Sequence, residues 1–567
     1  MNTNLTSQQS FTYKDLLLRK LYYSVVCSVL SQLVLLQIYV FASNLNILHP
    51  VQWILSTFQV FTSISTWLFI IPFMTIIFAQ SIICAKDYVF KPSYCSTRFQ
   101  KLISVFSVHN LVLLILNVIV GATLVWLFLS LGGGQYQSLT YQCKGQNYCL
   151  QEGTFFLILS GFWMGLYYFV KVYISEKHLS FPVVYQRKVL QMKAQLLPLL
   201  KESFMLSLAP TAYFIVLYYV WGFTLREGFI SSFGLLQEEN SNGILIYFYL
   251  WTFGAIYYFN MNLMRFFFNL FLTEPIQFPL FKETNESLCL QESINMSSLP
   301  IVQNLACLDL HNLAQWSKCR RRAFFTLSQP GGHPHNWNSL VENVLKLFNE
   351  YTELLNKSTL SVEKAKPSVP PIAPPCTFQS PDKFRNLRNM TMVSDNGLED
   401  FVNVTQEPLP VFTLPETVVM KLKQKISNLI AILKAVLGIN FFFGELPQAN
   451  IQKCLANGYL IIWTSQGIAD IACSSLVEDP FGIVQKDLPG IVTTLVQLKQ
   501  SLERLSKVPT LARKIAGYDD FNYRMKAAVT MAVKRSLFSI CLSFGNYLNE
   551  FPLSKDVLSH LNTIYKS

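Results

Sequence analysis

Six stretches of apolar sequence constrain the fold of this 567-residue chain more than any other feature. A helix needs about 20 mainly apolar residues to cross the hydrocarbon core of a bilayer, and each stretch approaches or exceeds that length. They lie at approximately 21–42, 58–84, 102–131, 154–174, 204–223 and 244–272. Only 14% of the residues are charged, whereas a soluble domain usually carries about 25%. The sequence therefore predicts an all-α polytopic membrane protein with six transmembrane helices.

The few charges of the first half predict its orientation. Residues 1–273 hold 16 Lys and Arg against 8 Asp and Glu. The basic residues gather in the N-terminal tail and in the loops after the second and fourth spans. The loops at 43–57, 132–153 and 224–243 hold at most one each. Because positively charged loops stay on the cytoplasmic side, both termini are expected there.

Composition then divides the chain into five segments. We expect a cytoplasmic tail at 1–20, a six-helix transmembrane domain at 21–273, a cytoplasmic helical segment at 274–357, a Pro-rich flexible linker at 358–417 and a C-terminal helical domain at 418–567. The linker is polar and rich in proline, and such sequence cannot bury a core. In the last segment, apolar periodicity predicts helices at 448–477, 483–507 and 521–549.

Two features of the membrane half concern its internal contacts. Cys143 and Cys149 lie in a predicted lumenal loop, where oxidising conditions permit a disulfide. The alternative is two free thiols near a membrane face. Gly161 and Gly165 form a GxxxG pattern in the fourth span, which allows close helix approach. That approach fits a contact inside the bundle or one between copies of the chain, so a homo-oligomer in the membrane stays open.

The cytoplasmic half contains an unusual run of turn-forming residues after a helical segment at 299–325. Pro-Gly-Gly and His-Pro force a turn here, which we interpret as a rigid connector or a partner-binding turn. The run consists of Ser328, Gln329, Pro330, Gly331, Gly332, His333, Pro334, His335, Asn336 and Trp337. Asn336 or Asn338 is expected to cap the helix that follows. A zinc site at the two histidines is disfavoured, because zinc needs three or four ligands.

A basic amphipathic helix is expected after Pro415. Its apolar residues recur at helical spacing, and lysines are interspersed with them. These lysines are Lys421, Lys423, Lys425 and Lys434. Such a helix fits a position on an anionic membrane surface, and it fits equally an ordinary helix of the C-terminal domain.

Catalytic and cofactor signatures are missing from the sequence. It contains no Walker motif, no strand-anchored GxGxxG, no GxSxG and no protein-kinase set. No basic and aromatic stripe indicates direct nucleic-acid binding. We therefore expect a non-enzyme without cofactor or metal. A transporter or channel is the competing class, and it needs polar residues that converge in mid-membrane; Asn110, Asn117 and Asn260 are the candidates.

The run FTLSQPGGHPHNW at 325–337 resembles a signature of the nuclear-division-cycle transmembrane nucleoporin family. Three other pieces are similar to the same family: HPVQW at 49–53, GQY at 134–136, and EDPFGIVQ at 478–485 followed by Leu488-Pro489. The resemblance covers most of the chain outside the linker. The linker lacks the long Ser/Pro-rich tract expected of vertebrate members.

The resemblance implies a structural role at the nuclear pore complex. Members are expected to be multi-pass proteins of the nuclear envelope that anchor the pore scaffold to the pore membrane and support pore assembly. The implied partners are membrane lipids and scaffold nucleoporins, among them a WD-repeat nucleoporin and a membrane-binding nucleoporin. The helical domain and both termini are expected on the cytoplasmic or pore side.

Overall fold

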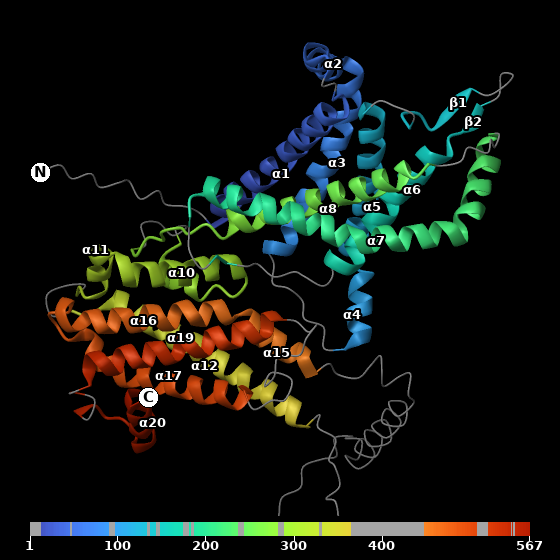
Figure 1. Cartoon of the computed structure of the whole chain (residues 1–567). Coiled ribbons are helices and arrows are strands. Elements are labelled where there is room, and N and C mark those ends of the chain that lie inside the picture. The colour runs from blue at the N-terminus through green and yellow to red at the C-terminus, as the bar shows by residue number, and fades with distance from the viewer. Residues whose placement is uncertain are drawn as a thin grey trace, which may run out of the picture.

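Figure 1 shows the computed structural model of the chain. It describes residues 13–45, 48–89, 97–132, 136–142, 148–173, 181–182, 186–235, 243–281, 288–327, 332–364, 447–506, 520–545, 547 and 550–566. Among these residues, the regular structure is helical except for one small antiparallel sheet. That sheet pairs β1 (Thr140–Gln142) with β2 (Tyr148–Leu150).

Six long helices contain most of the six predicted spans. They are α1 (Tyr13–Ser43), α3 (Ile64–Val89), α5 (Val108–Gly132), α6 (Glu152–Tyr168), α7 (Lys188–Phe233) and α8 (Leu245–Leu272). A short π-helix, η1 (Phe169–Tyr173), extends α6. The helices cross one another in a bundle, and the described residues after α8 form a helical domain at one end of it (Figure 1). The prediction of an all-α polytopic membrane protein is confirmed.

Hydropathy and packing single out different helices. Seven described helices are long and apolar enough to cross a membrane. They are α1, α3, α5, α6 with η1, α7, α16 (Gly458–Glu478) and α19 (Asp520–Phe544). We assign α16 and α19 to the helical domain, because they pack against each other, α10 and α17. The helix α8 is not among the seven, since its tyrosines and asparagines lower its hydropathy, yet it buries the most residues in the bundle.

The second and third spans begin later than the sequence predicted. Residues 50–62 form a separate helix, α2 (Pro50–Thr62), and Ser63 is extended before α3 begins. Likewise α4 (Arg98–Val105) precedes α5. Neither break contains a charged residue, so hydropathy averaged over a span could not locate them. We call the end of the bundle that carries α2 and the β1–β2 sheet the far end, because it lies opposite the helical domain (Figure 1).

The fifth span belongs to a much longer helix than predicted. The helix α7 has 46 residues, which corresponds to roughly 70 Å at 1.5 Å per residue. The hydrocarbon core of a bilayer is only about 30 Å thick, so α7 is too long for a single straight span, and Figure 1 shows that the helix is bent. The predicted span at 204–223 is therefore only the middle part of this helix. The sequence underestimated α7 because charged residues at 188–202 and 226–227 interrupt the apolar run without ending the helix.

Glycines hold α5 and α6 in close backbone contact. A Cβ atom added to Gly161 would lie 2.5 Å from the Gly121 carbonyl oxygen, and one added to Gly165 would lie within 2.4 to 2.8 Å of Asn117 and Val118 backbone atoms. Real Cβ atoms essentially never make such contacts. The GxxxG pattern thus packs inside the bundle, against a glycine of the neighbouring helix.

A buried lysine joins the bundle at the end near the helical domain. The Nζ atom of Lys20 on α1 donates to the carbonyl oxygens of Phe271 and Glu274 at 3.0 and 2.8 Å, just where α8 ends. The carboxylate of Glu274 also accepts from Lys188, at the start of α7, at 2.7 Å. A cation is favourable at a helix C-terminus. This contact ties the ends of three helices together at the point where the chain leaves the membrane.

The helical domain begins shortly after α8. Its elements are α9 (Leu290–Ile294), α10 (Pro300–Trp316), α11 (Lys318–Arg321), the 3-10 helix η2 (Arg322–Phe324), α12 (His335–Lys364), α15 (Pro447–Ala456), α16, α17 (Ile483–Ser506), α19 and α20 (Lys555–Lys566). The helix α16 packs between α10 and α19, and α12 packs on α17. The predicted helix at 448–477 is divided at Asn457. The predicted linker start at 358 is too early, because α12 continues to Lys364 and buries Ser358 and Thr359.

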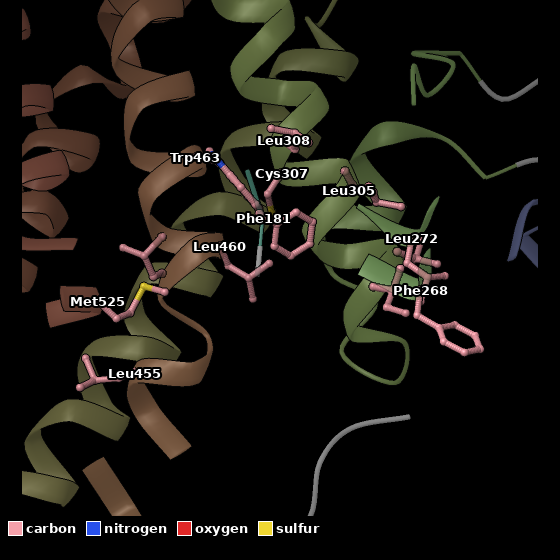
Figure 2. Close-up of a cluster of buried hydrophobic side chains, with 14 of the residues drawn as sticks. Phe181, Phe268, Leu272, Leu305, Cys307, Leu308, Leu455, Leu460, Trp463 and Met525 are labelled. Atoms are coloured by element: carbon pink, nitrogen blue, oxygen red, sulfur yellow. The ribbon is translucent and has the colours of Figure 1, made fainter. Parts of the chain in front are cut away.

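One hydrophobic core runs from the bundle into the helical domain. Phe181, in the segment between η1 and α7, is buried against Trp463 and Tyr459 of α16, with ring centroids 4.9 and 5.3 Å apart. Figure 2 shows Phe181 in the same cluster as Leu308 of α10 and Leu272 of α8. Because membrane helices and domain helices share this core, the two parts are packed as one body rather than tethered by a loop.

The glycine contact predicts opposite effects for the same substitution at two sites. Gly165→Ala should lower the free energy of unfolding by about 1–3 kcal/mol, because the new methyl group meets backbone atoms that have little room to shift. Gly228→Ala is the matched control: it lies in α7 with nothing within 4 Å of the added Cβ, and alanine favours a helix by about 0.5–1 kcal/mol. Thermal unfolding of the purified chain in detergent measures both. Equal shifts for the two variants would contradict the close α5–α6 contact.

Candidate functional site

The far end of the bundle carries a buried, disulfide-bonded cysteine. Cys149 lies on β2 opposite Tyr141 of β1, and it is disulfide-bonded. The eight other cysteines among the described residues form no disulfide, so its partner lies outside the described residues. Cys143 is one of the three cysteines there, and it directly follows Gln142, the last residue of β1. Pairing of Cys143 with Cys149 stays a prediction.

Three polar side chains in the bundle interior are hydrogen-bonded to one another. The Asn117 side-chain oxygen accepts from the Gln80 amide of α3 at 3.0 Å and from the Tyr257 hydroxyl of α8 at 3.2 Å. The Asn117 amide donates to the Leu113 carbonyl at 2.7 Å. All three side chains are buried, and the glycine contact between α5 and α6 lies beside them. This arrangement fits a structural clamp between three helices.

The other two asparagines do not join that clamp. The Asn110 amide donates to the Ser104 carbonyl and so connects α4 to α5. Asn260 is buried on α8, and among the described residues no hydrogen-bond partner meets its amide group. The three asparagines that a transporter site would bring together are therefore dispersed over different contacts.

The described part of the turn before α12 contributes Trp337 to the domain interior. Ser328, Gln329, Pro330 and Gly331 lie outside the described residues. Trp337 is fully buried, and its indole nitrogen donates to the Asp487 carboxylate of α17 at 2.9 Å. The Asn336 amide donates to the Ala323 carbonyl at 3.3 Å.

The turn therefore holds α12 to α17 rather than presenting Trp337 to a partner. His333 and His335 are exposed, and Gly332 and Pro334 are half-buried. The helix α12 begins at His335, so Asn336 and Asn338 lie within the helix instead of capping it. No group of three or more His, Cys, Asp and Glu side chains with metal-binding geometry occurs among the described residues.

A bidentate ion pair fixes the end of α16 to α11. The Arg321 guanidinium donates to the Glu478 carboxylate at 2.9 and 3.2 Å and to the Ala314 carbonyl at 2.6 Å. The two side chains are only 10% and 8% exposed. The hydrogen bond from Arg321 lowers the pKa of Glu478, because it stabilises the charged carboxylate.

A second arginine pair connects this region to the membrane bundle. The Arg320 guanidinium meets the buried Asp309 carboxylate of α10 with two contacts of 2.8 Å, and it donates to the Phe278 carbonyl at 2.7 Å. The Phe278 backbone amide donates to Asp309 in turn, at 2.8 Å. Phe278 lies six residues after the end of α8, so this network fixes the path of the chain as it leaves the membrane.

The Glu-Asp-Pro-Phe-Gly turn gives the same region a rigid shape. The Asp479 carboxylate accepts from the backbone amides of Phe481 and Val484, both at 3.0 Å, and so caps the start of α17. Gly482 has a φ of +64°, in the left-handed region that favours glycine. Asp479 and Gly482 thus fix the shape of the turn that exposes Phe481.

Large apolar side chains are exposed around this ion pair. Trp316 ends α10 and is 81% exposed, Val477 is 87% exposed beside Glu478, and Phe481 at the tip of the turn is 60% exposed. Lys318 and Arg322 are exposed at the same end of the domain. We call these five residues the docking surface. Clustered exposed apolar residues on a rigid frame are typical of a protein interaction site.

Sequence reasoning found the parts of this surface but not their association. It identified the helical segment at 299–325 and the EDPFGIVQ piece at 478–485, which are more than 150 residues apart. Asp309, an acidic residue among apolar ones on a predicted helix, was the one available signal of a buried partner for an arginine. The predicted membrane-surface lysines Lys421, Lys423, Lys425 and Lys434 lie outside the described residues.

The ion pair predicts a pH-dependent stability. Glu478→Gln should lower the free energy of unfolding by about 1–3 kcal/mol at pH 7, because it leaves the buried Arg321 guanidinium without its charged partner. A carboxylate with a lowered pKa contributes stability above its unfolded pKa, and that contribution is lost as pH falls through the folded value. The difference between wild type and variant should therefore shrink below pH 4.5.

Thermal unfolding of the full chain between pH 7 and pH 3.5 measures this difference. Glu342→Gln is the control, since Glu342 is an exposed acidic residue on α12 of the same domain. A gap between wild type and Glu478→Gln that stays constant over this range would contradict the assignment.

Comparison with known proteins identifies the family of nearly the whole chain. The sequence model of the family described as Nucleoporin protein Ndc1-Nup matches residues 15–562. The chain is 29% identical to nucleoporin Ndc1 of Drosophila pseudoobscura pseudoobscura, with 97% of this chain and 98% of that protein covered. It is 26% identical to nucleoporin NDC1 of Mus musculus and 25% identical to that of Homo sapiens, each with 96% of both chains covered. The chain belongs to the Ndc1-Nup family of nucleoporins.

Proposed function

We propose that this chain is a transmembrane nucleoporin that anchors the scaffold of the nuclear pore complex to the pore membrane and supports pore assembly. The observation that carries the proposal is the continuous core between the membrane bundle and a helical domain with an exposed docking surface. An anchor must transmit force between a soluble partner and the bilayer, and a shared core does so. Family membership implies a structural rather than a catalytic role.

The docking surface is the part of the helical domain that best fits a scaffold nucleoporin. Trp316 and Phe481 supply aromatic anchors, which dominate binding energy at protein interfaces. Lys318 and Arg322 give the rim a positive charge, so we infer an acidic segment on the partner. A WD-repeat nucleoporin and a membrane-binding nucleoporin are the proposed classes of partner.

The proposed topology places the helical domain and both termini on the cytoplasmic or pore side of the nuclear envelope. The start of α1 and the helical domain lie at the same end of the bundle, because Lys20 contacts the last turn of α8. The far end then faces the lumen, where the disulfide of Cys149 would persist. We propose Cys143 as its partner, since Cys95 and Cys376 both belong to segments that the topology places on the cytoplasmic side.

Two further contacts are proposed with the membrane and with other copies. The lysine-rich helix that holds Lys421, Lys423, Lys425 and Lys434 is proposed to lie on the anionic surface of the pore membrane. Copies of the chain are proposed to associate in a membrane ring. Gly161 and Gly165 are occupied by the contact with α5, so such a ring would use other surfaces of the bundle.

Substitution on the docking surface should separate binding from folding. Phe481→Ala combined with Trp316→Ala should reduce co-purification of scaffold nucleoporins at least about tenfold, because each removed anchor is expected to contribute more than 1 kcal/mol. Met531→Ala is the matched control, since Met531 is also exposed on the helical domain but lies on α19. Quantitative mass spectrometry of the tagged chain from cells measures binding, and its level at the nuclear rim reports folding.

Normal co-purification of scaffold nucleoporins by the double variant would reject the docking surface. Equal loss with Met531→Ala would reject its specificity.

The disulfide gives a direct test of the proposed topology. Peptide mapping of the chain under non-reducing conditions should find a peptide that links Cys143 to Cys149, because the far end is proposed to be lumenal. Cys143→Ser should release Cys149 as a free thiol that alkylating reagents label after denaturation. Linkage of Cys149 to Cys95 or Cys376 would contradict the proposed pairing and the lumenal position together.

A further inference from the structure

The helix α2 at the far end has three distinct faces along its 13 residues. Its inward face is half-buried and consists of Trp53, Thr57, Val60 and Phe61. A second face is polar and exposed, and consists of Gln52, Ser56 and Gln59. The third face is apolar and exposed, and consists of Val51, Ile54, Leu55 and Phe58. At 3.6 residues per turn, each set occupies about one third of the helix circumference.

Side-chain hydrogen bonds from the spans hold α2 against their ends. The Trp53 indole donates to the Phe41 carbonyl near the end of α1 at 2.7 Å. At the other end of α2, the Thr66 hydroxyl and the Trp67 indole of α3 donate to the carbonyls of Val60 and Phe61 at 2.6 and 2.9 Å. These two carbonyls belong to the last turn of α2, where no partner within the helix is available.

These bonds set the depth and direction of α2. Trp53 and Trp67 lie at the ends of two spans, the position where tryptophan is enriched at membrane interfaces. Figure 1 shows α2 nearly end-on above α3, so the helix lies across the span instead of continuing it. The last-turn carbonyls are satisfied by protein, and the helix end therefore does not depend on water.

The exposed apolar face continues the apolar outer surface of the bundle. Ile38 of α1 and Leu68 of α3 are exposed large apolar residues close to the two attachment points. Residues 43–63 contain no Asp, Glu, Lys or Arg. A face without charges that adjoins a membrane-exposed surface matches lipid chains better than the charged rim of a protein partner.

We propose that α2 is an interfacial helix that lies in the plane of the far leaflet and inserts Ile54, Leu55 and Phe58 among the acyl chains. Its polar face is in contact with water and headgroups, and its third face packs on the bundle. The helix therefore occupies area in that leaflet alone. This inference rests on the arrangement of α2 and holds whether or not the docking surface recruits a scaffold nucleoporin.

Cysteine substitution in single-copy nanodiscs tests the position of each face. The variants are Ile54→Cys and Phe58→Cys on the apolar face, with Gln52→Cys and Gln59→Cys as matched controls on the polar face of the same helix. Alkylation needs the thiolate, which does not form in the acyl region, so a water-soluble maleimide should modify the first pair at least about tenfold more slowly. Mass spectrometry of the peptide at 43–63 avoids interference, because it contains no native cysteine.

The other possible occupants of this face give different results. Protection of Ile54→Cys and Phe58→Cys in nanodiscs of phosphatidylcholine and phosphatidylserine supports the proposal, since only lipid and one copy of the chain are present. Protection in native envelope membranes but not in nanodiscs would overturn it in favour of a protein partner or a second copy. Equal modification of all four variants in both settings would show that α2 faces water. All four native side chains are exposed, and thermal unfolding of each variant checks that the fold is kept.

Discussion

The burial of α8 is the constraint on which the rest of the structure depends. This helix lacks the strongly apolar stretch that marks the other long helices of the bundle as candidate spans, and it is also the most enclosed, with packing against α1, α6 and α7. Tyr257 and Tyr258 are fully buried on it, and a tyrosine hydroxyl or an asparagine amide is costly in lipid unless a protein group meets it. Asn117 of α5 supplies such a group for Tyr257, whereas among the described residues no partner meets the hydroxyl of Tyr258 or the amide group of Asn260. The bundle therefore forms around α8, and α8 leads directly into the helical domain.

The helical domain is held to the bundle by apolar and charged contacts of different kinds. Phe181 joins the two parts through the shared core, while Lys20 and Arg320 bind backbone carbonyls on either side of the exit from the membrane. Apolar burial supplies most of the favourable free energy of such an interface. The charged contacts fix the path of the chain after α8, because Lys20 binds the carbonyls of Phe271 and Glu274 and Arg320 binds the carbonyl of Phe278.

The sequence predicted the spans well because hydrophobicity and loop charge act locally. It could not predict the break at Ser63, which leaves no mark in average hydropathy. It also missed the full length of α7, because charged residues interrupt the apolar run without ending the helix. Trp337 was expected in a rigid connector or a partner-binding turn, and its burial against Asp487 depends on a residue 150 positions away. The Arg321–Glu478 pair and the Phe181 contact were missed for the same reason. Contacts between distant segments can be recognised only once the fold is known, because in the sequence each partner resembles an ordinary surface or loop residue.

The shared core has a mechanical consequence. A flexible tether transmits only tension along its length, but a packed joint also transmits torque. A lateral push on Trp316 or Phe481 would reach α10 and α16, pass through Phe181, and tilt the bundle in the bilayer. The bundle and the helical domain would therefore move together about the membrane surface. Bending of the membrane would displace whatever is bound to the helical domain, and displacement of that partner would tilt the bundle.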